Sequence, residues 1–168
     1  MKSAAHVGDH PIHPMLIPYP FAFLSSAIAF DLAGLAKGDE RLGQTANVLT
    51  KAGIVSALAA AVPGLIDYVQ RVPAGEPRKT ATLHMVSNLS ALACFGAAAF
   101  MRGDRARPSN AVLALEAIGA GVLSLGGWLG GSLAYHHQIG VVPEERDDRW
   151  ELTVRSHLLQ DNAIPTRA

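Results

Sequence analysis

Four long stretches with almost no charge constrain this chain more than any other feature. Residues 80–101, TATLHMVSNLSALACFGAAAFM, contain no Asp, Glu, Lys or Arg, and residues 14–36, 46–66 and 111–135 contain one such residue each. A bilayer core needs about 20 mainly apolar residues per helix. A soluble four-helix bundle would need a polar face along each helix, and none of these runs shows one over its middle turns. The sequence therefore predicts an all-α fold, an integral membrane four-helix bundle in a lipid bilayer.

The runs also set the expected organisation of the chain. The first run is longer than the apolar region of a cleaved signal peptide and contains Asp31, so we expect it to be retained. A transmembrane domain is expected over residues 1–137 and a polar C-terminal tail over 138–168. The helices are expected at about 15–36, 46–69, 79–101 and 110–136.

Composition and motifs exclude several functional classes. Lys and Arg together number 14, as do Asp and Glu, so the net charge is zero and no basic surface predicts a nucleic-acid partner. No motif for a nucleophilic serine, a phosphate-binding loop or a Cys-x-x-Cys pair is present. The chain is therefore expected to be an electron-transfer or binding subunit rather than a stand-alone enzyme.

An even number of spans places both termini on one membrane face. Lys and Arg residues are nearly balanced between the two faces, but those between the first and second and the third and fourth helices are concentrated in short loops. Because such loops stay in the cytoplasm, we expect both termini outside.

Polar residues gather on the face that carries the termini. Imidazole is the commonest metal ligand and an axial ligand of haem, and helical bundles build such sites from several helices. We expect haem b or a metal ion, with His13, His84 and His137 as haem ligands and His10 and Asp67 as further metal ligands. Asp67 could instead orient a histidine. Interfacial histidines can also be solvated or cap helix carbonyls. The set is His10, His13, Asp67, His84, Asn88, His136 and His137, with Asn88 and His136 in supporting places.

Three charged residues lie toward the opposite face: Asp31, Lys51 and Glu116. They are interpreted first as an ion-paired group that makes the charges tolerable, and second as a proton entry point. Glycines spaced by four at 126–131 indicate close helix packing, or space for a flat macrocycle. The prolines of HPIHPMLIPYP predict a rigid, partly extended arm that holds His10 and His13 over the end of the bundle.

The pieces HPIHPMLIPYP, GLIDY, HMVSN and GGWLGGSLAYHHQIGV, spread over about residues 8–142, resemble a bacterial family of predicted membrane proteins, domain-of-unknown-function family 2231. The resemblance implies a four-helix domain in the bacterial inner membrane, sometimes joined to Rieske-type or cytochrome c domains. By this resemblance, the family's recurrent polar positions correspond to His10, His13, Asp67, His84, Asn88 and His137. His136 stands where members commonly have a basic residue.

Three hypotheses for the function follow from these observations. The first is a haem- or metal-binding electron-transfer subunit that serves a Rieske-type or cytochrome c partner. The second is a non-catalytic anchor or partner subunit of a larger redox complex. The third is a proton or ion pathway from the charged residues to the histidine face. Association into a homo-oligomer stays open.

Overall fold

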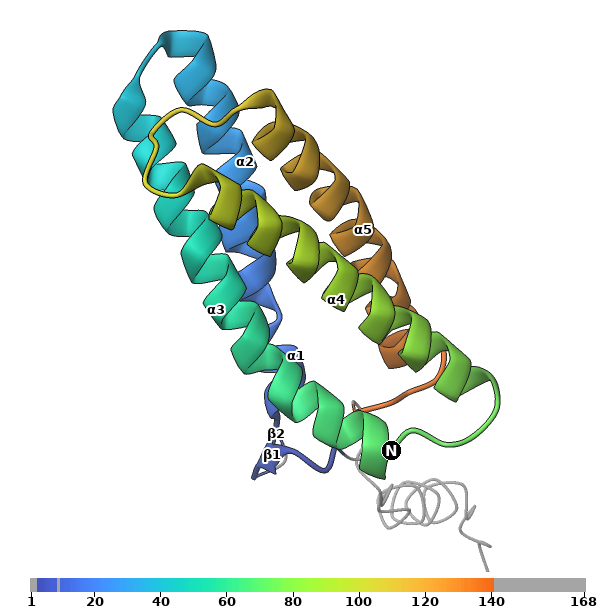
Figure 1. Ribbon diagram of the computed structural model, residues 1–168. Helices are drawn as coiled ribbons and strands as arrows, with labels where there is room; N and C mark the ends of the chain where they lie inside the picture. Colours follow the sequence, from blue (N-terminus) through green and yellow to red (C-terminus); the bar gives the residue numbers. More distant parts are fainter. Residues whose placement is uncertain (1–2, 9, 141–168) are drawn as a thin grey trace, which may run out of the picture.

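The computed structural model describes residues 3–8 and 10–140, and long helices dominate it (Figure 1). Four helical segments are long and apolar enough to cross a membrane, which confirms the all-α, four-helix class. The polar tail lies outside the described residues beyond Gly140. The elements are β1 His6–Val7, β2 His10–Pro11, α1 Ile12–Leu16, α2 Pro18–Lys37, α3 Glu40–Gln70, α4 Glu76–Arg102 and α5 Asn110–Tyr135.

The first span is divided into α1 and α2. Pro18 has no N–H to donate to the carbonyl of Pro14, and Pro20 has none for Leu16, so the helical ladder is interrupted. Pro18 is the first residue of α2, where the missing donor costs little. His13 therefore lies in a helix, whereas the sequence predicted a partly extended arm over this residue; the described strands of the arm, β1 and β2, end at Pro11.

The four spans form two antiparallel pairs (Figure 1). α2 packs along α3 and α4 along α5, and these contacts are far more extensive than those between the pairs. The α2–α3 turn and the 103–109 loop lie at what we call the charged end. The N-terminal arm, the 71–75 connection and the end of α5 lie at the opposite, histidine end. The polar residues singled out in the sequence are therefore divided between the charged end and the histidine end of the bundle.

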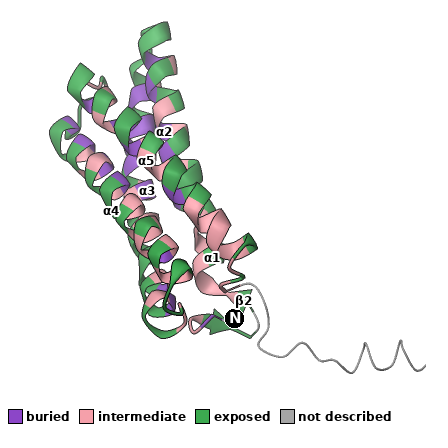
Figure 2. Cartoon of the chain, turned by 90° about the vertical axis from the view of Figure 1, so that its right-hand side faces the viewer, coloured by how far each residue is buried: buried purple, intermediate pink, exposed green. Residues whose placement is uncertain are grey.

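Buried residues lie along the inner faces of the helices (Figure 2), most of the buried apolar residues are alanines, and many large apolar residues are exposed. Ala27, Ala46 and Ala98 are fully buried, whereas Phe100 and Trp128 are 90% and 76% exposed. This pattern is typical of helices that pack closely through small residues and present their large side chains to lipid. The bundle is that of a multi-pass membrane protein.

Candidate functional site

His13 and His84 approach each other across the gap between the two helix pairs. Their ring centroids are 6.2 Å apart and the ring planes are nearly perpendicular. Nδ1 of His13 lies 2.8 Å from the carbonyl oxygen of Ala60, and Nδ1 of His84 lies 2.8 Å from that of Gly126. A carbonyl oxygen can only accept, so each Nδ1 carries the proton that it donates, and the neutral form of either ring has its lone pair on Nε2.

Glycines make room for these rings. A Cβ atom on Gly64 of α3 would lie 2.8 Å from atoms of the His13 ring, and one on Gly130 of α5 would lie 3.0 Å from Cε1 of His84. Each imidazole therefore lies against a helix backbone, where a side chain at Gly64 would clash with the ring and one at Gly130 would force it to shift. The glycines at 126 and 130 were predicted to favour close helix packing. They face the side chains of Asn88 and His84 of α4.

Asn88 lies one turn after His84 on the same face of α4. Its Nδ2 donates to the carbonyl of His84 at 2.8 Å and lies 3.2 and 3.3 Å from the two ring nitrogens. Its amide occupies the space over Gly126, where a Cβ would come within 2.8 Å. Asn88 therefore lies next to His84, and its supporting role stays a prediction.

A cavity of about 420 Å³ opens beside the two imidazoles, and we call it the histidine pocket. All five helices contribute to its wall, which is mainly apolar. A volume of this size lies within the range of small-molecule and cofactor sites, which combine apolar walls with a few polar groups. Its polar side chains include His13, Asp67, Tyr68, His84 and Asn88.

Asp67 anchors the N-terminal arm. Its carboxylate accepts from the Ser3 hydroxyl at 2.7 and 2.8 Å, from the backbone N–H of Ala4 at 2.6 Å and from that of Ala5 at 3.2 Å. Both oxygens are therefore engaged by the arm. This arrangement differs from the two roles predicted for Asp67, metal ligation and orientation of a histidine.

The remaining predicted histidines do not join the pair. His10 is exposed on β2 and His136 is exposed at the end of α5. His137 is half-buried, with Nε2 3.4 Å from the hydroxyl of Thr80. Within residues 3–8 and 10–140, no three His, Cys, Asp or Glu side chains come close enough together to hold a metal ion. The site has two converging imidazoles instead of the larger ligand set that the sequence suggested.

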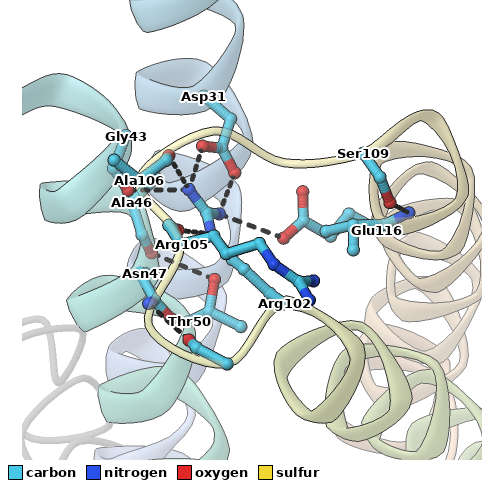
Figure 3. A network of polar contacts seen from close by, with 12 residues as sticks. Asp31, Gly43, Ala46, Asn47, Thr50, Arg102, Arg105, Ala106, Ser109 and Glu116 are labelled. Atoms are coloured by element: carbon cyan, nitrogen blue, oxygen red, sulfur yellow. Dashed lines mark hydrogen bonds and ion pairs between the residues drawn. The ribbon is translucent and has the colours of Figure 1, made fainter. Parts of the chain in front are cut away.

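At the charged end, the central residue is Arg102 (Figure 3). Its guanidinium forms two parallel bonds with Asp31 at 2.5 and 2.7 Å and donates to the carbonyls of Gly43, Ala106 and Arg105. Glu116 lies 3.9 Å from the same guanidinium. Asp31, Arg102 and Glu116 are all at most 2% exposed.

Lys51 does not belong to this group, although the sequence placed it there. It pairs with Asp104 at 3.3 Å, and both side chains are largely exposed. Arg102 was missed because it follows the apolar run and was counted with the loop charges. Asp31 and Glu116 are two carboxyl groups inside spans, and buried carboxylates need a cation nearby. This need could have pointed to Arg102, the last residue of α4. Ser3, which binds Asp67, has no comparable signal in the sequence.

Fold and site together define a multi-pass helical membrane protein with a mainly apolar, histidine-lined pocket at one end and a buried ion-paired cluster at the other. The family model described as "Predicted membrane protein (DUF2231)" matches residues 9–143, and the chain belongs to this family. The comparison with curated proteins and the comparison with solved structures gave no match.

Proposed function

We propose that the chain is a membrane electron-transfer subunit that binds a b-type haem in the histidine pocket, where His13 and His84 would hold the iron. The observation that carries this proposal is the pair of imidazoles 6.2 Å apart, each with Nδ1 fixed by a backbone carbonyl. That hydrogen bond is the usual outer-shell partner of a metal-bound histidine, because it fixes the tautomer with Nε2 free to coordinate.

The spacing of the two rings suits coordination of a single ion. A metal–nitrogen bond of about 2.0 Å on each side puts the centroids of two opposed imidazoles roughly 6 Å apart. His84 would first have to release the 3.3 Å contact between its Nε2 and Asn88. Asn88 could then keep its stronger bond to the carbonyl of His84.

A haem iron suits the pair better than a bare metal ion. Haem supplies four nitrogen ligands and leaves two positions for protein side chains, whereas structural and catalytic zinc sites use three or four. The described part of the chain brings two histidines together and groups no third His, Cys, Asp or Glu side chain with them closely enough to hold a metal ion. With both axial positions held by protein, such a haem is suited to electron transfer, and we expect a redox protein of the Rieske or cytochrome c class as its partner.

The test is the optical spectrum of the detergent-purified protein, before and after reduction with dithionite. We expect a Soret band with sharpened α and β bands after reduction. His13→Ala and His84→Ala should each abolish these bands. His10→Ala and His136→Ala are matched controls, because they remove exposed imidazoles at the same end of the bundle, and they should keep full occupancy.

Two results would overturn the proposal. One is a wild-type protein that carries no haem and takes up none when the precursor is supplied during expression. The other is undiminished haem in both the His13→Ala and the His84→Ala proteins. Either result would favour the hypothesis of a non-catalytic anchor or partner subunit.

A further inference from the structure

The carboxyl group of Glu116 lies deep in the charged end without a hydrogen bond. Its side chain is 1% exposed, and within the described residues neither carboxyl oxygen has a hydrogen-bond partner. Burial of an ionised carboxylate without such partners is strongly unfavourable. Its ion-pair contact is 3.9 Å with Nη1 of Arg102, and the carboxyl group of Asp31 also lies beside it.

The charge of Arg102 is already balanced by Asp31. Nη1 and Nη2 bind both oxygens of that carboxylate, Nη2 also faces two backbone carbonyls, and Nε donates to a third (Figure 3). A bidentate guanidinium–carboxylate pair is the strongest form of this contact. If Glu116 were ionised as well, one positive group would face two negative groups inside a span.

Among the residues labelled in Figure 3, the only charged side chain besides Asp31, Arg102 and Glu116 is that of Arg105. From α3, Figure 3 shows the side chains of Asn47 and Thr50, which are uncharged. Lys51 points to Asp104 at the surface. Arg105 is directed to the carbonyl of Met101. The cluster is electrically neutral when one of its two carboxyl groups carries a proton, and Glu116 is the one without a hydrogen-bonded cation.

We propose that Glu116 is a proton-binding site at the charged end, and that its carboxyl holds an exchangeable proton while the Arg102–Asp31 pair stays ionised. The site lies seven residues after Ser109, the residue that caps α5, or about 10 Å along the helix axis. It is therefore close to the membrane face formed by the α2–α3 turn and the 103–109 loop. This site is independent of the haem proposed for the histidine pocket.

The test is infrared spectroscopy of the full-length protein in liposomes at neutral pH, where exposed carboxyl groups are ionised. We expect the C=O stretch of a protonated carboxyl group, shifted on transfer to D₂O, that Glu116→Gln removes. Glu40→Gln, an exposed change, should leave the band intact. Absence of the band in the wild type, or its persistence in Glu116→Gln, would overturn the proposal.

A second measurement covers the case in which a variant folds poorly. Glu116→Gln should keep the wild-type Tm, because it replaces a neutral group by a neutral group of similar shape. Asp31→Asn should lower the Tm clearly, because it leaves the buried guanidinium without its counterion. Equal losses in the two variants, including failure of both to fold, would show that Glu116 acts as an ionised counterion and would contradict the proposal.

Discussion

At the scale of single residues, three glycines decide where the polar side chains of the histidine pocket lie. Gly64, Gly126 and Gly130 face His13, Asn88 and His84 respectively. A Cβ atom added at any of the three would lie within 3.0 Å of the facing side chain. Neighbouring glycines of α5 differ, since Gly121 has nothing within 4 Å. A side chain added at one of the three positions therefore acts directly on the position of a ring or an amide.

We predict that Gly64→Ala and Gly130→Ala weaken haem binding at least tenfold, or about 1.4 kcal/mol. The added methyl group displaces an imidazole whose Nδ1 is bonded to a backbone carbonyl. Its Nε2 then moves away from the position from which it would bind the iron. The measurement is a titration of the apoprotein with haem, followed by absorbance. Gly121→Ala is the matched control and should bind as the wild type does. Wild-type affinity in both site variants would refute this role for the glycines.

Asp67 provides a second residue-scale prediction. Asp67→Asn removes the charge that holds the Ser3 hydroxyl and two backbone N–H groups, and we expect a loss of about 1–3 kcal/mol in the stability of the arm. Amide exchange of Ala4 and Ala5 should accelerate, measured by mass spectrometry. Haem content should not change, because the carboxylate serves the arm. A lost haem signal in a folded Asp67→Asn protein would return this residue to the ligand set.

At the scale of elements, the N-terminal turn of α3 shows what a cap contributes. The apolar run predicted a helix from about residue 46, but α3 begins at Glu40 because the Asp39 carboxylate accepts the N–H of Arg41 at 2.9 Å. Ser109 caps α5 in the same way through Val112. Helix length in this bundle is therefore set partly by polar residues outside the apolar runs.

Asp39→Ala should fray this first turn at a cost of about 1 kcal/mol. Amides of residues 40–45 should exchange faster with deuterium, while those in the middle of α3 keep their protection. Glu40→Gln is the control, because it changes a neighbouring exposed charge and leaves the cap intact. Unchanged exchange over 40–45 in Asp39→Ala would mean that packing against the bundle, and not the cap, holds this turn.

The sequence predicted the class of fold because lipid imposes a simple rule on apolar length. It also predicted that His13 and His84 lie at one level, since alternating spans bring their helix ends to the same face. It could not predict which histidines converge. His10 and His13 are only three residues apart, yet one is on a strand and exposed while the other is on α1 and faces Ala60.

Partner choice at the charged end was also beyond the sequence. Lys51 lies within an apolar run and Arg102 at the end of one, so the lysine looked like the buried cation. The longer, planar guanidinium reaches back to Asp31 and satisfies three carbonyls as well, which a lysine ammonium could not do with the same geometry. Such differences depend on the rotation of each helix and on side-chain reach, and neither quantity is encoded in hydropathy.

At the scale of the whole molecule, the side of the membrane on which each end lies is a prediction that labelling tests. We predict that a maleimide reagent that cannot cross the bilayer labels Glu76→Cys in intact cells and does not label Lys37→Cys, because basic loops stay inside. Both changes are made in a Cys94→Ala background, since Cys94 is the chain's one cysteine. The unsubstituted background is the blank, and the reverse labelling pattern would place the termini in the cytoplasm.

The division of the bundle into two pairs has a consequence for how the protein can be assembled. One pair, with the arm and α1, carries His13, and the other carries His84, joined by the short 71–75 connection. Each pair is a helical hairpin of membrane length that can insert as a unit. Two polypeptides cut at that connection and produced together should reconstitute the bundle, and only the reconstituted complex would contain both imidazoles. Recovery of the complex from the two separate halves would therefore measure directly whether the two helix pairs dock.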